Sequence, residues 1–103
     1  QLKDLRNKKI LLDEIKNKPL DPYTNYQLGK NYIISSDYED AIYYMEKSYD
    51  LYTKINYIPI FVTLDLASLY IDLGEFDKCE KLCIKYMKQD NKNIDIYYYL
   101  AIS

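Results

Sequence analysis

The sequence is poor in the residues that catalytic and metal sites most often use. It contains no histidine, so the commonest general base and metal ligand is missing. Its only glycines, Gly29 and Gly74, lie far apart, which excludes a glycine-rich phosphate-binding loop. Two glycines and three prolines also allow few turns, so long regular elements are expected. We therefore predict a segment that is not an enzyme and that has no cofactor and no metal site.

Other features that the sequence lacks restrict the partners. With 14 basic and 16 acidic side chains, the net charge of −2 gives no positive excess for nucleic acid or an anionic membrane. No apolar run approaches the roughly 18 residues that a membrane-spanning helix needs. Two cysteines do not make a disulfide framework, which favours a cytoplasmic, intracellular setting. Because the chain begins with Gln1 rather than methionine, we expect it to be part of a longer protein.

What the sequence does contain is a folded-domain composition and an internal repeat. Apolar residues make up 49% of the 103 residues, which is typical of one small folded domain. The repeated pattern is a leucine, a small residue and a tyrosine, followed by a small and then a larger residue. Its members are Leu28, Gly29, Tyr32, Ala41 and Met45 in the first copy, and Leu66, Ala67, Tyr70, Cys79 and Cys83 in the second. A partial third copy contains Tyr97, Leu100 and Ala101, and the first two copies are offset by 67 − 29 = 38 residues.

This pattern resembles the tetratricopeptide repeat, a 34-residue helix pair with the pattern W-x₂-L-G-x₂-Y…A-x₃-F…P. The tryptophan is replaced by Asn25, Thr63 and Tyr97, and both full copies lack the closing proline. The resemblance implies an all-α fold of antiparallel helix hairpins, stacked in a right-handed superhelix (an α-solenoid). The implied parts are an N-terminal helix at 1–18, repeats at 22–56 and 59–91, and the first helix of a third repeat at 94–103. The helix at 1–18 is either a capping helix or the second helix of a preceding repeat.

Helix start and stop signals agree with this organisation. Asp21 precedes a proline and can cap a helix, and Asn93 can cap the last one. Ser36 and Glu39 have the spacing of a capping box, and Gly74 can end a helix in the left-handed conformation. The sequence therefore predicts helices at 2–17, 23–35, 38–55, 59–73, 76–89 and 94–103.

Cys79 and Cys83 are spaced i and i+4, so they could share a soft metal. Two thiolates do not complete a four-ligand site, however, and both residues fall at core-facing repeat positions. We interpret them as packing residues.

The candidate binding site is the concave face of the repeat. The resemblance implies that the first helix of each pair lines a concave groove that holds ligands. In this chain those helices are apolar even on the side away from the repeated leucine and tyrosine. The predicted partner-binding residues are Tyr23, Tyr26, Lys30, Ile33, Phe61, Leu64, Ser68, Ile71 and Tyr98. Two alternatives stay open, since further repeats or a second copy of the chain in a homodimer could cover this face.

The partner is expected to be a protein or peptide. Some tetratricopeptide proteins bind chaperone C-terminal carboxylates through a clamp of lysine, asparagine and arginine. At the corresponding places this chain has Tyr26, Lys30, Asp65 and Asp95, so the clamp is absent. An apolar or helical segment with a basic group for the aspartates fits better.

The leading hypothesis is a non-catalytic protein–protein interaction module that binds a peptide or helical segment in its concave groove. The alternative is a peptide-sensing regulatory domain, because the 38-residue offset resembles the lengthened repeats of bacterial peptide-responsive signalling and transcription regulators. A third hypothesis is a regulatory appendage of an enzyme whose active site lies elsewhere.

Overall fold

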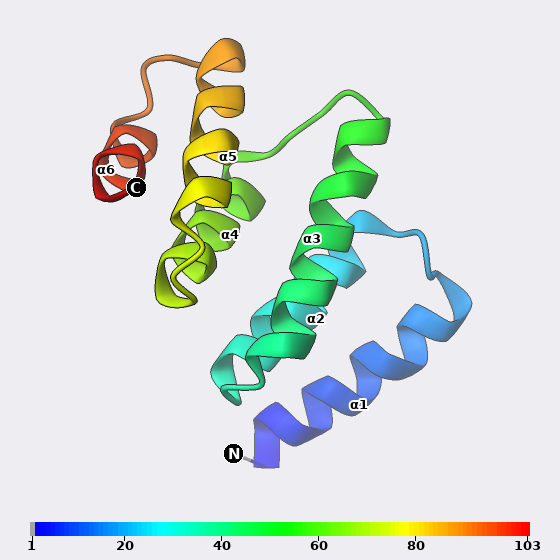
Figure 1. Ribbon diagram of the computed structural model, residues 1–103. Helices are drawn as coiled ribbons and strands as arrows, with labels where there is room; N and C mark the ends of the chain where they lie inside the picture. Colours follow the sequence, from blue (N-terminus) through cyan, green and yellow to red (C-terminus); the bar gives the residue numbers. More distant parts are fainter. Residues whose placement is uncertain (1) are drawn as a thin grey trace. The chain divides into compact units, whose positions relative to one another are not determined.

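The computed structural model describes residues 2–103, and within them the chain is all-α. Six helices and no strand occur in this part of the chain (Figure 1). They are α1 (Leu2–Asn17), α2 (Pro22–Ile34), α3 (Tyr38–Lys54), α4 (Ile60–Asp72), α5 (Phe76–Gln89) and α6 (Ile94–Ile102). Each helix boundary lies within one residue of the boundary that the sequence predicts. The all-α fold class is therefore confirmed.

The chain divides into two compact units. The first contains α1, α2 and α3 and ends at Tyr57, and the second, Ile58–Ser103, contains α4, α5 and α6. The division falls in the link between the two predicted full repeats. The exact repeat boundaries, 22–56 and 59–91, stay a prediction.

In the first unit, α2 and α3 form a hairpin whose separation is set by Gly29. A Cβ atom added at Gly29 would lie 2.9 Å from the Met45 Cε and 3.2 Å from the Met45 backbone nitrogen. Because glycine has no side chain there, the backbone of α3 can approach α2 closely. Leu28, Ala41 and Met45 are fully buried around this contact. The small residue in the repeated pattern is thus required by helix packing.

Helix α2 has the N-cap that the sequence predicts. The Asp21 carboxylate accepts hydrogen bonds from the Thr24 backbone N–H at 2.9 Å and from the Thr24 hydroxyl at 2.6 Å. Helix α6 is capped in the same way, because Asn93 Oδ1 accepts the Ile96 N–H at 3.2 Å. Gly74, which follows α4, has a φ of +74°. These three signals are confirmed.

The predicted capping box at Ser36 is wrong. Only three residues separate α2 from α3, and Ser36 takes a φ of +61° within this turn. Its N–H donates to the Ile33 carbonyl at 3.0 Å, so Ser36 completes the end of α2 instead of starting α3. Asp37 is the N-cap of α3 and makes no side-chain capping bond. The short connection needs a left-handed residue, which decides the role of Ser36.

In the second unit, α5 packs against both α4 and α6. Leu66, Ala67, Cys79 and Cys83 are buried at the positions that the repeat predicts. The Cys79 thiol points to the Tyr99 carbonyl of α6 at 3.9 Å. Burial raises the pKa of the Cys83 thiol to about 12, with a smaller contribution from Cys79. Both cysteines are therefore buried packing residues, and the Cys83 thiol stays protonated at neutral pH.

The position that the repeat pattern fills with tryptophan has a shared role in all three copies, which the sequence did not predict. In each copy a polar side chain donates a hydrogen bond to the backbone that precedes its own helix. The bonds are Asn25 Nδ2 to the Asp21 carbonyl at 2.8 Å, Thr63 Oγ1 to the Pro59 carbonyl at 3.1 Å, and Tyr97 OH to the Asn91 carbonyl at 2.7 Å. The Asp21 and Pro59 carbonyls also accept the backbone N–H of Asn25 and Thr63, so the side chain adds a second donor to each.

Candidate partner-binding site

Helix α2 carries four of the predicted binding residues, and they differ in exposure. Tyr23 is 50% exposed and its ring stacks on Tyr26 with 5.9 Å between centroids. Tyr26 itself is only 8% exposed, and the Lys30 amine lies 5.9 Å from the centre of its ring. Lys30 is exposed and Ile33 is half-buried. Tyr26 therefore packs against Tyr23 and Lys30, and it exposes little surface that a partner could contact.

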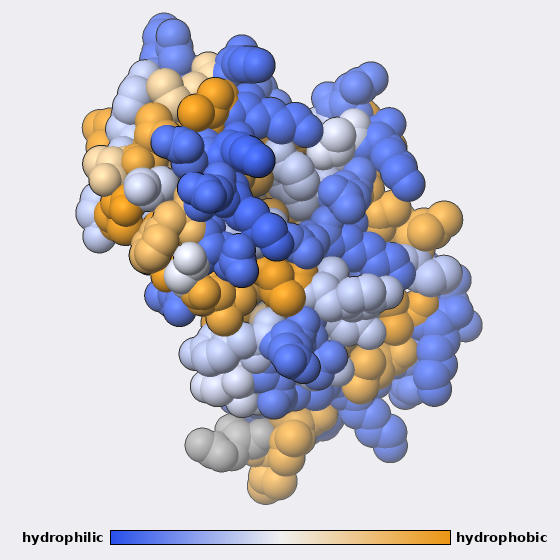
Figure 2. All heavy atoms as spheres, in the orientation of Figure 1, coloured by the Kyte–Doolittle hydropathy of each residue, from blue (hydrophilic) through white to orange (hydrophobic). Residues whose placement is uncertain are grey.

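In the second unit, the predicted residues lie on α4 and α6. Phe61, Leu64, Ser68 and Ile71 follow one another along α4, and all four are half-buried. Tyr98 of α6 is 62% exposed and meets Tyr99 edge-on, with 5.4 Å between ring centroids. Figure 2 shows apolar side chains gathered over α6. Apart from Tyr26, every predicted residue keeps surface that a partner could contact, and the binding role of the set stays a prediction.

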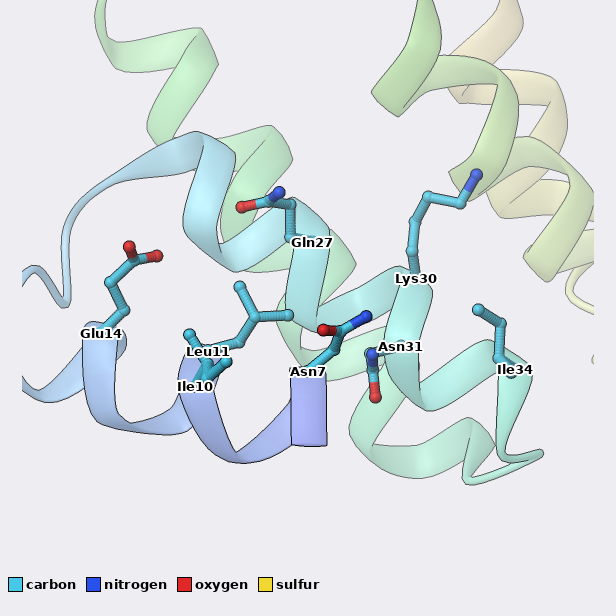
Figure 3. A pocket seen from close by; sticks show the side chains of 8 residues that line it. All are labelled: Asn7, Ile10, Leu11, Glu14, Gln27, Lys30, Asn31 and Ile34. Carbon is cyan, nitrogen blue, oxygen red and sulfur yellow. The ribbon is translucent and has the colours of Figure 1, made fainter. Parts of the chain in front are cut away.

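A groove that the sequence did not predict lies between α1 and α2. This α1–α2 groove has a volume of about 440 Å³ (Figure 3). It is lined by Asn7, Ile10, Leu11 and Glu14 from α1 and by Gln27, Lys30, Asn31 and Ile34 from α2. A second hollow of about 230 Å³ adjoins it and is lined by Asp4, Leu5, Lys8, Asn31, Ile34 and Ser35. Of the predicted binding residues, only Lys30 belongs to this groove.

The groove combines apolar surface, amides and charges of both signs. Figure 3 shows Leu11 and Asn31 between the two helices, while Lys30 extends away from α1. Asn31 is 8% exposed, and its Oδ1 accepts no hydrogen bond from the described residues. A buried amide oxygen without a donor is uncommon, because leaving it unpaired is unfavourable. Asn31 is therefore the chemically distinctive residue of the groove.

Lys8 holds α1 at one end of the groove. Its amine lies 2.9 Å from Ser35 Oγ, 3.6 Å from Asp37 Oδ2 and 4.4 Å from the centre of the Tyr32 ring. Burial is the main cause of a raised pKa at Tyr32, and the neighbouring Tyr44 adds to it. No residue of α1 is fully buried, and the half-buried Leu11, Leu12 and Ile15 contribute to its packing besides Lys8.

The sequence contains a signal for the α2 side of the α1–α2 groove. Gln27, Asn31 and Ile34 are spaced i, i+4 and i+7, so they share one face of the helix. This face is separate from the face with Leu28 and Gly29, which packs on α3. A helix with two packing faces indicates neighbours on both sides. The sequence alone does not say that α1 leaves an opening there.

Two further properties of the described residues concern chemistry and membranes. Residues 2–103 contain no group of three or more cysteine, aspartate or glutamate residues placed to hold a metal ion. In the same range, no helix has both the length and the apolar character to cross a membrane.

The comparisons with known proteins define the fold class. The chain is an all-α helical-repeat protein of the α-solenoid type, and a similar solved structure is that of "Assembly Chaperone of RpL4 (Acl4) (Residues 1-338)". That structure superposes with a TM-score of 0.75 at 16% sequence identity, which shows a shared fold alone. The match covers 95% of this chain and 36% of that chain, so this chain spans about a third of the similar protein. No family model and no curated protein sequence matches this chain.

Proposed function

We propose that this chain is a non-catalytic interaction module of the tetratricopeptide type that holds a segment of another polypeptide. The observation that carries the proposal is the exposure of large aromatic side chains on the first helices of the hairpins. Tyr23 of α2 is 50% exposed and Tyr98 of α6 is 62% exposed. Tyrosine is favoured at protein interfaces, because its ring buries a large area while its hydroxyl keeps a polar partner.

The repeat assignment is supported by the burial of the repeated residues. Leu28 and Leu66, which occupy the same repeat position, are 0% and 1% exposed, and Ala41 and Cys79 are both fully buried. These four residues of the repeated pattern are therefore used for packing. Tyr23 and Tyr98 lie outside the pattern, and exposed apolar surface beyond what packing uses is typical of an interface.

The similar structure is consistent with this function. Its protein is named as an assembly chaperone of RpL4, so an α-helical protein with the same fold acts on another protein. For this chain we propose only the class of partner, a protein or a peptide. A few neighbouring repeats are enough to form a surface that binds a protein or a peptide, because each repeat contacts mainly its neighbours.

The test uses charge substitutions at tyrosines of similar exposure. Tyr23→Lys and Tyr98→Lys should each reduce the recovery of a crosslinked protein partner, because a lysine removes ring contacts and introduces an ammonium group. Tyr43 on α3, a second helix, is 57% exposed, so Tyr43→Lys is the matched control. Loss of an aromatic hot spot costs about 2 kcal/mol, or roughly a 30-fold loss in affinity. Equal recovery with all three variants would place the binding surface elsewhere.

A peptide-sensing regulatory domain is the second candidate. The volume of the α1–α2 groove, about 440 Å³, favours it, because small-ligand sites occupy about 300–1,000 Å³. Mass spectrometry of the ligand that copurifies with the protein separates the two candidates. A protein partner supports the interaction module, whereas a short peptide supports the sensor.

A further inference from the structure

We propose that the α1–α2 groove binds an α-helix of a partner polypeptide, in the way that α4 packs against α5 and α6 in the second unit. The proposal rests on the proposed function, because it specifies the kind of segment that the partner offers. It adds a site away from the predicted partner-binding residues, since only Lys30 belongs to both sets.

The first step is an internal correspondence between α1–α2 and α5–α6. Asp21 and Asn93 are the N-caps of α2 and α6, and they lie 93 − 21 = 72 residues apart. The same offset relates Leu28 of α2 to Leu100 of α6. Four residues connect the two helices in both pairs, 18–21 in one and 90–93 in the other. Helix α1 therefore corresponds to α5, and α2 corresponds to α6.

The second step is that α5 is covered on a side where α1 is open. Helices α4 and α6 both pack against α5, and four residues of α5 are buried. These are Cys79, Leu82, Cys83 and Tyr86. The residues of α1 at the 72-residue offset are Asn7, Ile10, Leu11 and Glu14. They are the four α1 residues that line the groove, and none of them is buried. The groove thus lies where a helix equivalent to α4 would pack.

The third step is the apolar part of the lining, which suits one face of a helix. Ile10 and Ile34 are 55% and 61% exposed and lie on the two sides of the groove, with the half-buried Leu11 between the helices (Figure 3). An amphipathic helix presents apolar side chains at spacings of three and four residues along one face, which can cover these three residues together.

The fourth step concerns the origin of the occupying helix. At the positions of Cys79 and Tyr86, helix α1 has two polar side chains. They are Asn7 and Glu14, and both are exposed. Such groups are hydrated while the groove is empty, whereas permanent burial without a partner is unfavourable. Permanent interfaces are also more apolar than those that form and separate. The lining therefore favours a helix of another polypeptide that binds reversibly.

The fifth step is the direction of the partner helix. Gln89 at the end of α5 donates to the Ile58 carbonyl, so α4 begins beside the end of α5. By the same arrangement the partner helix begins beside Glu14, near the end of α1. Figure 3 shows Glu14 at one end of the groove and Lys30 toward the other. Because a helix is partly positive at its N-terminus and partly negative at its C-terminus, both charges favour this direction.

The test uses a helical peptide as the probe. The probe is a hydrocarbon-stapled, fluorescently labelled peptide with the sequence of α4, Ile60–Asp72, because α4 packs in the corresponding place in the second unit. The control peptide is unstapled and carries Leu66→Pro, which prevents the helix. Fluorescence anisotropy should show that the control binds to the protein about tenfold more weakly than the probe, or less.

A pair of protein variants tests where the probe binds. Ile10→Lys places an ammonium group in the groove and should weaken binding of the probe about tenfold. Ile84 on α5 has a similar exposure, 46%, and lies outside the groove, so Ile84→Lys should leave binding unchanged. Circular dichroism checks that both variants keep their helices.

The direction of the helix is tested with nitroxide labels on the probe. A label at its N-terminus should broaden the NMR signal of the Glu14 backbone amide. A label at its C-terminus should broaden the signal of Ile34 instead. The reversed pattern would mean that the groove does not repeat the place of α4, and it would overturn the inference.

Four other results would also overturn the inference. Absence of probe binding would mean that the groove does not accept a helix, and equal binding of the control peptide would mean that helical structure is not what it recognises. Unchanged binding by Ile10→Lys would place the probe elsewhere. Hydrogen exchange in α1 as slow as in α5, without the probe, would mean that the protein itself or a second copy already covers the groove.

The tyrosine variants distinguish this inference from the proposed function. If Tyr23→Lys and Tyr98→Lys lose the partner while the probe does not bind, the inference fails and the proposed function stands. If the probe binds as expected and none of the tyrosine variants loses the partner, the proposed aromatic surface fails instead.

Discussion

Each of the two units contains a helix hairpin, and the side-chain hydrogen bonds that close the two hairpins differ. In the first, Ser48 of α3 donates to the Pro22 carbonyl at the start of α2, at 2.7 Å. In the second, Gln89 at the end of α5 donates to the Ile58 carbonyl just before α4, at 3.0 Å. With the 38-residue offset, Ser48 corresponds to Tyr86 and not to Gln89. The buried repeat residues are thus kept at fixed positions, while the polar ties that close each hairpin differ in residue and position.

The largest expected effect concerns the closest approach of α2 and α3, which is specific to the first unit. Gly29→Leu should lower the free energy of unfolding by about 1–3 kcal/mol, because the added side chain would collide with the backbone of Met45. Urea denaturation measures this change. Lys30→Leu is the control, since the neighbouring position is exposed, and should change stability by less than about 0.5 kcal/mol. Equal stabilities for the two variants would mean that α2 and α3 have room to separate.

The next effect concerns the N-caps of α2 in the first unit and of α6 in the second unit. Asp21→Ala and Asn93→Ala should each cost about 1 kcal/mol, because both side chains accept a backbone N–H at their helix start. Hydrogen exchange in the first turns of α2 and α6 measures the loss locally. A loss at α2 without one at α6 would show that the cap of α6 is not formed in solution.

The two caps differ in their response to pH. The hydrogen bond from the Thr24 hydroxyl is the main cause that holds the pKa of Asp21 below its ordinary value of 3.8, with burial opposing it. Asp21 therefore stabilises α2 above pH 3.8, and this stabilisation is lost as the pH falls below that value through the lowered pKa of the folded state. Asn93 does not titrate, so the start of α6 should keep its protection over the same range. In Asp21→Asn, the acid-dependent loss at α2 should disappear.

A smaller effect tests the polar residue at the tryptophan position of the repeat. Thr63→Val removes the buried hydrogen bond to the Pro59 carbonyl while keeping the shape, and should cost about 0.5–1 kcal/mol, because the Thr63 N–H still pairs with that carbonyl. Thr53 makes the same i to i−4 bond to the Tyr49 carbonyl at 2.9 Å but is half-buried. Thr53→Val should therefore cost less in the same thermal unfolding experiment. A reversed order would mean that burial does not decide the strength of these bonds.

Helix positions could be predicted from the sequence because helical periodicity and local capping determine them. The spacing of Leu28, Gly29 and Tyr32 and the caps at Asp21 and Asn93 gave boundaries within one residue. Ser36 is the exception, because Ser36 and Glu39 have the spacing of a capping box although Ser36 completes the end of α2. Only the three-residue connection between α2 and α3 shows that it needs a left-handed conformation.

The candidate site was less predictable, since exposure and grooves depend on how helices pack. Tyr23 and Tyr26 look alike in the sequence, yet one is half-exposed and the other is buried beneath it. The α1–α2 groove depends on the distance between two helices whose facing residues are ordinary amides and aliphatics. No local pattern marks Asn31 as unpaired, because its missing partner is a property of the whole neighbourhood.

The smallest expected effect compares the flanking helices of the two units. Helix α1 buries no residue completely and makes exposed contacts through Lys8 with Ser35 and Asp37, whereas α6 buries Ile96 completely. Lys8→Met should cost at most about 1 kcal/mol, because partly exposed ion pairs are weak. Hydrogen exchange should show faster exchange in α1, and 1 M salt should produce part of the same change in the parent, since the Debye length falls to about 3 Å. Exchange in α6 should be unaffected by this substitution, because its anchor is apolar. A change in α6 equal to that in α1 would show that the flanking helices do not differ in the way that their contacts indicate.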